Sequence, residues 1–182
     1  SVDYTLAAVR HAKTVIAQVN DQMPFTYGEA VLDVSEIDYF VEHSNPLIEL
    51  PAAKLTDIEK AIGANCASLI QDGDTLQLGI GAIPDAVLFY LKDKKHLGIH
   101  SEMISDGVVE LVEAGVITGS KKALLPGKIV VNFLMGTKRL YDFIDHNKDV
   151  LMYPVDYVND PVVVAQNDHI VCINSCVQID LM

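Results

Sequence analysis

Residues 75–102 read TLQLGIGAIPDAVLFYLKDKKHLGIHSE, and this stretch decides the fold. Residues 75–78 predict a strand, and the glycines that follow predict a tight turn. A helix is expected from about Pro84 to residue 91, because a proline in the first helical turn sacrifices no hydrogen bond. Residues 97–100 predict the next strand, which ends just before Glu102. This order is typical of a βαβ unit with parallel strands.

The same alternation continues on both sides of that stretch. Thr56 is a good N-cap, and Glu59 completes a capping box for a helix that runs to about Ile70. The apolar side chains on one face of this helix are Ile58, Ile62, Cys66 and Leu69. Further elements are expected as helices at 108–114 and 141–143 and as strands at 128–133, 150–154 and 170–173. The predicted fold class is α/β, with an open, mainly parallel sheet and flanking helices.

The first part of the chain has a less regular pattern. It predicts a helix at residues 2–13, strands at 14–20 and 31–34, and a short helix or turn at 35–43. Tyr27-Gly28 is expected in a loop, and a linker with prolines at positions 46 and 51 follows. The pattern therefore predicts a boundary that separates residues 1–52 from residues 53–182.

Composition excludes several classes of protein. The chain has 182 residues, half of them apolar, and a formal net charge of −12, which argues against nucleic-acid binding. It contains no apolar run long enough for a membrane span. Three cysteines cannot form a disulfide framework and suit a reducing cytoplasm; Cys172 and Cys176 are expected to be buried thiols. The six histidines lack metal-ligand spacing, so no metal site is predicted.

The glycine turn admits three interpretations. A turn that opens a helix presents free N–H groups, which suit a phosphate or a developing oxyanion, but it can also be a tight turn without a ligand. A dinucleotide fingerprint needs a third glycine, where this chain has Pro84, and an acid about 20 residues on, near Glu102. NAD binding therefore stays open as an alternative.

The third interpretation makes Glu102 a nucleophile. A carboxylate can attack an activated acyl group, and it then needs fixed donors for the negative oxygen of each tetrahedral intermediate. Backbone N–H groups of residues 79–83 and the side-chain amide of Gln77 are the candidate donors. Ligands of open α/β sheets bind beyond the carboxyl ends of the strands, which is where Glu102 is expected.

Five stretches carry a family resemblance: residues 77–87, 97–107, 133–143, 154–161 and 173–176. Together they resemble the acetyl-CoA hydrolase/transferase family over nearly the whole chain. The resemblance implies two α/β domains of similar fold, of which residues 1–52 would end the first and residues 53–182 would begin the second. It also implies an active site between the two domains.

The resemblance implies a CoA-transferase that moves CoA between an acyl-CoA and a small carboxylic acid such as 4-hydroxybutyrate, butyrate or acetate. In its ping-pong reaction, Glu102 becomes an acyl anhydride and then a glutamyl-CoA thioester. Gln77 matches a residue beside the reacting carbonyl. The residues that match the CoA-binding segment are Gly79, Ile80, Gly81, Ala82 and Ile83. An acyl-CoA hydrolase of the same family remains the alternative.

On the same resemblance, coenzyme A is a substrate, no cofactor is bound permanently, and the full-length protein is a homo-oligomer. Relatives extend beyond both ends of this chain, so we expect the chain alone to have little transferase activity.

Several other residues near these motifs carry side chains that could take part in the reaction or in binding. His100 lies two residues before Glu102 and could relay protons, but a packed, hydrogen-bonded histidine is the stronger expectation. Ser101 lacks the G-x-S-x-G context of a serine hydrolase. Lys138 and Arg139 are candidates for phosphate contacts, and Asp106-Gly107 is expected to form a turn.

Overall fold

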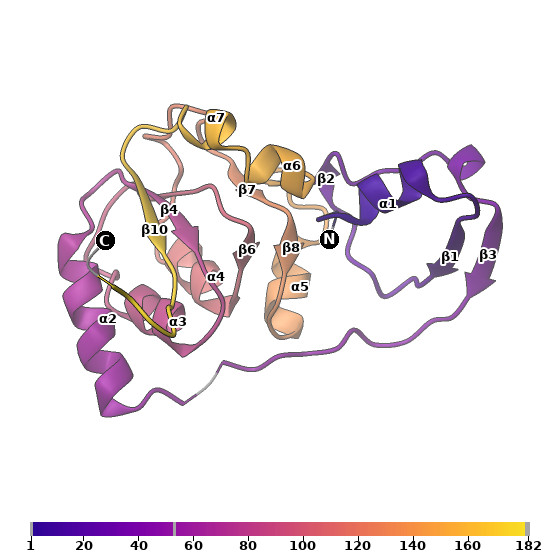
Figure 1. Cartoon of the computed structure of the whole chain (residues 1–182). Helices are drawn as coiled ribbons and strands as arrows, with labels where there is room; N and C mark the ends of the chain where they lie inside the picture. The colour runs from indigo at the N-terminus through magenta and orange to yellow at the C-terminus, as the bar shows by residue number, and fades with distance from the viewer. Residues whose placement is uncertain (1, 53, 181–182) are drawn as a thin grey trace.

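The computed structural model describes residues 2–52 and 54–180. Residue 53, at the predicted domain boundary, lies outside these ranges. Helices alternate with short strands along the chain (Figure 1). The N-terminal elements are α1 (Thr5–His11), β1 (Ile16–Val19), β2 (Tyr27–Gly28), η1 (Val34–Glu36) and β3 (Tyr39–Glu42).

The elements predicted after the linker are found in the expected order, and the structure adds four short ones, β6, β8, α6 and α7, that the sequence did not predict. The first group comprises α2 (Asp57–Leu69), β4 (Thr75–Leu78), α3 (Ala82–Phe89), β5 (Gly98–Ile99), β6 (Met103–Ile104) and α4 (Asp106–Glu113). The second comprises β7 (Ile129–Val131), β8 (Phe133–Leu134), α5 (Lys138–Ile144), β9 (Val150–Met152), α6 (Val155–Val158), α7 (Pro161–Val164) and β10 (Ile170–Ile173). The βαβ unit read from residues 75–102 is confirmed as β4, α3 and β5.

Every strand pairing in the described part of the chain is parallel. Strands β10, β4 and β5 form one sheet and β2, β9 and β7 another, and a parallel bridge between His100 and Val130 joins β5 to β7. The order across the joined strands is therefore β10-β4-β5-β7-β9-β2. The short pair β6–β8 continues β5 and β7 at their carboxyl ends. The predicted fold class is thus confirmed.

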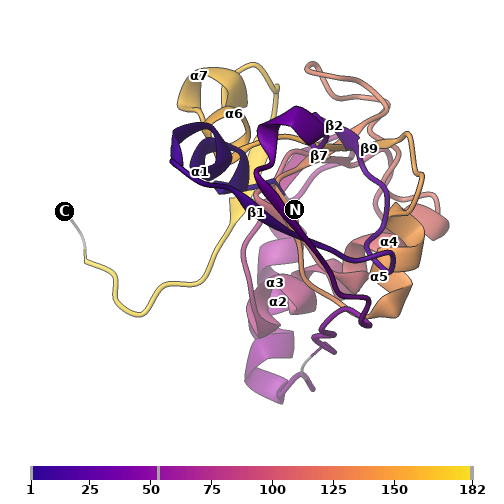
Figure 2. The ribbon, with the colours of Figure 1, turned by 90° about the vertical axis from the view of Figure 1, so that its right-hand side faces the viewer.

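Helices cover the sheet on two sides. Helix α2 packs on α3, and α4 lies between α3 and α5. Helices α6 and α7 lie on the other side of the molecule, next to α1 (Figures 1 and 2). The backbone N–H of Val155 in α6 donates to the carbonyl of Asp3, just before α1, at 3.1 Å. No helix within residues 2–52 and 54–180 is long and apolar enough to cross a bilayer.

The pair β1–β3 lies apart from this sheet, and a linker runs from β3 back to α2 (Figure 1). Three hydrogen bonds hold the linker against α5 and the loop before it, one of them from the Lys138 N–H to the Glu49 carboxylate at 2.9 Å. The N–H of Leu50 donates to the Gly136 carbonyl at 2.9 Å, and the Tyr141 hydroxyl donates to the Ile48 carbonyl at 2.8 Å. These contacts fix the linker, although its described residues contain no regular element.

Several expectations for the N-terminal part are wrong. Tyr27-Gly28 is not a loop but β2, which pairs with β9. No local signal marks it, because its partner lies more than 120 residues further on. Residues 31–34 do not form a strand, because no strand pairs with them and Val31 stays exposed. The helix or turn expected at 35–43 is only partly correct: η1 covers its first two residues, whereas residues 39–42 form strand β3, whose Tyr, Phe and Val suit β structure.

The two C-terminal cysteines also differ from expectation, since both thiols are exposed rather than buried. Cys172 lies on β10, which is an edge strand of the sheet described here, and Cys176 follows the end of that strand. An edge strand packs fewer neighbours around its side chains than a central one. The apolar sequence around these cysteines therefore overstates their burial.

The capping box of α2 is confirmed: the Thr56 hydroxyl accepts from the Glu59 N–H, and the Glu59 carboxylate accepts from the Thr56 N–H. The predicted apolar face is only partly correct. Ile58 and Leu69 are 74% and 75% exposed, whereas the small residues Gly63 and Ala67 are buried. A Cβ at Gly63 would lie 2.7 Å from the backbone of Ala86 in α3, so close helix contact selects the buried face.

We predict that Gly63→Ala destabilises the protein. Alanine favours a helix over glycine by about 1 kcal/mol, but overpacking against α3 costs about 1–3 kcal/mol, so the net change is a loss. Urea denaturation of the intact protein measures it. Ala64→Gly, at an exposed position of the same helix, is the control and isolates the propensity effect. An increase in stability for Gly63→Ala would contradict the close packing of α2 on α3.

Lys122 is a buried cation that links β5 to the residue before β7. Its ammonium donates to the carbonyls of Ile99 and Lys128 at 2.8 and 2.7 Å. A Cβ at Gly98 would collide with the Lys122 stem, so this strand position accepts glycine alone. Burial lowers the pKa of Lys122 from 10.5 to about 8. Because the neutral amine keeps two N–H donors, both carbonyl contacts survive deprotonation.

This lowered pKa predicts a pH dependence of stability. Between pH 8 and 10.5 the unfolded chain binds more protons at this lysine than the folded one, so stability rises with pH in that window. The free energy of unfolding should gain about 1.5 kcal/mol from pH 8 to about pH 9.5, relative to Lys122→Met. Denaturation of both proteins across this range measures the difference. Parallel curves for the two proteins would show that Lys122 does not titrate there.

Candidate active site

The carboxyl ends of β4, β5 and β10 converge on one cavity of about 330 Å³. Because these strands are parallel and adjacent, the residues at their ends are brought to the same edge of the sheet. The polar or titratable side chains that line the cavity are Gln77, His100, Ser101, Glu102, Asn159, Cys172 and Asn174. Gln77 and Glu102, which the sequence proposed as a pair, thus meet in one cavity.

Glu102 is held at both its backbone and its side chain. Its carbonyl accepts from the N–H groups of Asn132 and Phe133 at 3.1 and 3.0 Å, which ties the end of β5 to the end of β7. Its carboxylate oxygen Oε2 accepts from Asn159 Nδ2 at 2.7 Å. The residue is partly exposed. The carboxylate therefore has a fixed orientation and an opening to solvent, which a nucleophile needs.

Gln77 and Asn174 form a reciprocal amide pair beside Glu102. Asn174 Nδ2 donates to Gln77 Oε1 at 2.7 Å, and Gln77 Nε2 donates to Asn174 Oδ1 at 3.3 Å. The pairing follows from the register of β10 on β4, in which Cys172 lies opposite Gln77. Each NH₂ group carries a second hydrogen that the pair does not use. The pair is therefore a source of N–H donors for a negative oxygen in this cavity.

The glycine loop lies next to this cavity, not within it. Gly79, Ile80, Gly81 and Ala82 line a separate hollow of about 140 Å³. The Gly79 N–H donates to the Ile173 carbonyl at 2.7 Å and so is already committed to the sheet. In the described residues, no hydrogen bond joins residues 79–83 to the Glu102 carboxylate. The structure thus separates the loop from the carboxylate that its N–H groups were expected to reach.

Two glycines of the loop have different structural roles. A Cβ at Gly79 would lie 2.7 Å from Asn174 Oδ1, so this glycine lets the Gln77–Asn174 pair approach β4. Gly81 adopts a φ of +112°, which glycine tolerates and other residues rarely adopt, and it serves as the N-cap of α3. Helix α3 consequently begins at Ala82, two residues before Pro84.

Acidic side chains line the hollow beside the loop. Asp85 accepts from the Ser105 hydroxyl at 2.8 Å, and burial raises its pKa. Asp106 accepts from the N–H and hydroxyl of Thr137 at 2.8 and 2.7 Å. Asp106-Gly107 is therefore not the expected turn: these residues start α4, and Asp106 ties α4 to the N-cap of α5. Two carboxyl groups make this hollow a poor site for a phosphate.

The cations predicted for phosphate contacts are paired with acids. Lys138 Nζ contacts Asp142 Oδ2 at 2.7 Å, and Arg139 contacts Glu113 and Glu110 at 2.5 and 3.4 Å. The Glu113 carboxylate raises the pKa of the Arg139 guanidinium. Both cations are thus engaged within the chain and offer no unpaired charge to a phosphate.

The two residues between β5 and Glu102 have structural roles. The Ser101 hydroxyl accepts from the Leu78 N–H and donates to the Met103 carbonyl, both at 2.8 Å, which agrees with the absence of a nucleophile elbow. His100 is buried, and its Nε2 lies 2.9 Å from the Val158 carbonyl. Burial lowers the pKa of His100. It is therefore a packed, hydrogen-bonded neutral histidine, as the sequence favoured.

Sequence reasoning missed Asn159 and Asn174 as site residues. Both lie in stretches that carried the family resemblance, but nothing local places them near Glu102. Asn159 follows α6 and comes 57 residues after Glu102, and Asn174 follows β10 and comes 97 residues after Gln77. Only the tertiary fold brings these amides to the cavity.

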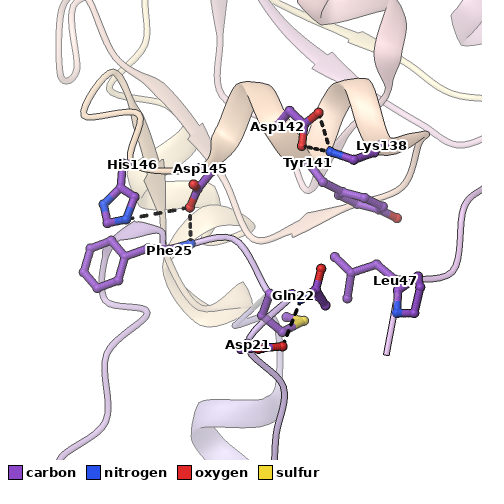
Figure 3. A pocket seen from close by; sticks show the side chains of 11 residues that line it. Asp21, Gln22, Phe25, Leu47, Lys138, Tyr141, Asp142, Asp145 and His146 are labelled. Atoms are coloured by element: carbon purple, nitrogen blue, oxygen red, sulfur yellow. Dashed lines mark hydrogen bonds and ion pairs between the residues drawn. The ribbon is translucent and has the colours of Figure 1, made fainter. Parts of the chain in front are cut away.

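A larger cavity of about 360 Å³ lies elsewhere, between residues 21–25 and helix α5 (Figure 3). Asp21, Asp142 and Asp145 make it acidic, and the Phe25 ring stacks on His146 at 4.9 Å. Of the residues predicted for catalysis or CoA binding, only Lys138, a candidate for phosphate contacts, lines it. Within residues 2–52 and 54–180, no cluster of three or more His, Cys, Asp or Glu side chains is arranged to hold a metal.

Comparisons with known proteins agree with one another. Residues 136–182 match the model of the acetyl-CoA hydrolase/transferase C-terminal domain. The whole chain is 67% identical to a 4-hydroxybutyrate coenzyme A transferase of Clostridium kluyveri and covers 42% of it. It is 49% identical to a succinyl-CoA:acetate/propanoyl-CoA:succinate CoA transferase of Fasciola hepatica and covers 38% of it.

Among solved structures, the whole chain superimposes on a 4-hydroxybutyrate CoA-transferase from Porphyromonas gingivalis with a TM-score of 0.95. The sequence identity is 50%, and the chain covers 46% of that structure. The chain therefore spans less than half the length of these relatives.

The contact between Gly79 and Asn174 predicts a compensating pair of substitutions. Gly79→Ala should destabilise the protein by about 1–3 kcal/mol, because the new methyl group displaces the Asn174 side chain. Asn174→Ala removes the oxygen that the methyl group meets, so the double variant should lose less stability than the sum of the single variants. Denaturation of all four proteins measures this coupling. Strict additivity would contradict the contact.

Proposed function

We propose that this chain, which belongs to the acetyl-CoA hydrolase/transferase family, supplies the nucleophile of a CoA-transferase. The observation that carries the proposal is the Glu102 carboxylate, held by Asn159 in the cavity that contains the Gln77–Asn174 amide pair. The names of the relatives support the same reaction. These relatives are more than twice as long as this chain. Activity and substrates are therefore proposed for the whole protein.

The chemistry follows from a carboxylate nucleophile. A Glu102 oxygen attacks the thioester carbonyl of an acyl-CoA, the C–S bond breaks, and a mixed anhydride and CoA thiolate result. The thiolate then attacks the Glu102 carbonyl, which releases the first acid as its carboxylate and leaves a glutamyl-CoA thioester. A second carboxylate repeats both steps in reverse order, forms a new acyl-CoA and regenerates Glu102. No net proton is gained or lost.

The amide pair has a role in each of these steps. Attack on a carbonyl places negative charge on its oxygen, and fixed N–H donors stabilise that charge better than water does. Gln77 and Asn174 each have an N–H to offer from a position already set by their mutual hydrogen bonds. Asn159 holds one carboxylate oxygen, so the other is the attacking atom.

Coenzyme A is proposed as substrate, with no permanent cofactor. Gly79, Ile80, Gly81, Ala82 and Ile83 are proposed to bind it, as the family resemblance implied. Because Asp85 and Asp106 line the hollow next to this loop, we assign to the hollow the uncharged pantetheine part rather than the phosphates.

The acceptor is proposed to be a small carboxylic acid such as 4-hydroxybutyrate, butyrate or acetate, after the transferases to which this chain is similar. A hydrolase would instead admit water to the glutamyl thioester, and product formation without an acceptor acid separates the two activities. We further propose a cytoplasmic homo-oligomer in which residues 1–52 end one domain and residues 53–182 begin the next.

Glu102→Gln in the full-length protein should lower the transfer rate by at least about a thousandfold, because an amide is a very poor nucleophile. Transfer of CoA from an acyl-CoA to acetate, followed by chromatography, measures the rate. Glu110→Gln is the matched control: this acid lies on the exposed face of α4 and should stay within about twofold of the unmodified protein.

Borohydride reduction during turnover gives a second readout. A thioester at Glu102 is reduced to an alcohol, which mass spectrometry detects as a change in the mass of the peptide that contains residue 102. Retained turnover in Glu102→Gln, or an unchanged peptide after turnover with borohydride, would contradict the proposal.

A further inference from the structure

His100 makes one hydrogen bond that bears on the geometry of the active site. The residue is only 1% exposed, and its Nε2 lies 2.9 Å from the carbonyl of Val158. A carbonyl oxygen can only accept, so Nε2 carries the hydrogen of this bond. Burial lowers the pKa of His100, which agrees with a neutral ring. The imidazole is therefore a fixed donor to Val158.

Val158 ends α6, and the next residue is Asn159, whose side chain holds Glu102. Helix α6 has four residues, a single turn, and so short a helix is not stable without tertiary contacts. One anchor lies at its start, where the Val155 N–H donates to the Asp3 carbonyl. The hydrogen bond from His100 is an anchor at its other end.

These contacts close a ring. From His100 the path crosses one hydrogen bond to Val158, one peptide link to Asn159 and a second hydrogen bond to Glu102. Glu102 is two residues along the chain from His100, so both ends of the path rest on β5 and the residues that follow it. The position of the Asn159 amide relative to Glu102 is thus set by the imidazole.

We propose that His100 is a positioning residue for the Glu102 nucleophile, acting through the Val158 carbonyl and the Asn159 side chain. The inference rests on the proposed function, in which the orientation of the Glu102 carboxylate limits attack on the thioester. Without the ring N–H, the end of α6 loses its anchor, and Asn159 no longer holds the carboxylate in one orientation. A displacement of about 1 Å in a reacting group can lower a rate by about a hundredfold.

Two amide variants separate this role from simple packing. In His100→Gln the side-chain nitrogen can occupy the place of Nε2 and donate to Val158. In His100→Asn the nitrogen reaches only the place of Nδ1, so the donor is misplaced. We expect His100→Asn to lower the rate constant for acyl transfer about tenfold, the effect of one lost hydrogen bond to a buried acceptor. His100→Gln should stay within about threefold.

The measurement is single-turnover formation of the Glu102 thioester in the full-length protein, together with the KM for acyl-CoA. A positioning role lowers kcat and leaves KM within about twofold, because CoA contacts are unchanged. Rates are compared for protein of confirmed folded fraction, so that instability does not count as slow chemistry. Equal rates for His100→Asn and His100→Gln, or a rate for His100→Asn equal to that of the unmodified protein, would overturn the inference.

A double-mutant cycle tests the route through Asn159. If His100 acts through this amide, His100→Asn in an Asn159→Ala background should change the rate by less than about twofold, because the link is already broken. A full tenfold loss in that background would overturn the inference. Glu102→Gln distinguishes the two proposals. Turnover in that variant would contradict the transferase mechanism. An inactive Glu102→Gln together with unaffected His100 variants would contradict only the positioning role.

Discussion

Parallel pairing of β4 with β5 and of β5 with β7 is the constraint on which the rest of this structure depends. The regular pairing is short: two residue pairs join β4 to β5, and one bridge, between His100 and Val130, joins β5 to β7. Because the strands run in one direction, their carboxyl ends lie at the same edge, and Gln77 and Glu102 meet there. Any shift in this pairing would separate the carboxylate from the amides that surround it.

Glycines let neighbouring elements pack closely around these short strands. Gly63 lets α2 lie against α3, Gly98 makes room for the stem of Lys122, and Gly79 admits the side chain of Asn174. In each case a side chain would separate two elements that must touch, so the cost of glycine in a helix or strand is offset by packing. Lys122 adds a polar link, because its ammonium donates to the Ile99 carbonyl in β5 and to the Lys128 carbonyl before β7.

Electrostatics determine which part of a ligand suits each surface. The chain carries a net charge of −12, and Lys138 and Arg139, the cations predicted for phosphate contacts, are engaged by acids. The region around the glycine loop is thus poorly suited to a phosphate and better suited to a neutral chain. The proposed placement of pantetheine follows from this distribution of charge, which the glycine pattern alone would not have suggested.

The sequence by itself determined the α/β class, strand β4, the capping box of α2, and the place of Glu102 at a strand end. These features depend on neighbours within a few residues, such as periodicity, caps and turn glycines, and local sequence encodes them. Only the tertiary structure decided that Tyr27-Gly28 is a strand, that α2 packs through its small residues, and that Asn159 and Asn174 reach the cavity. Each of these depends on a partner tens of residues away, and a local pattern holds no information about which distant segment will complete it.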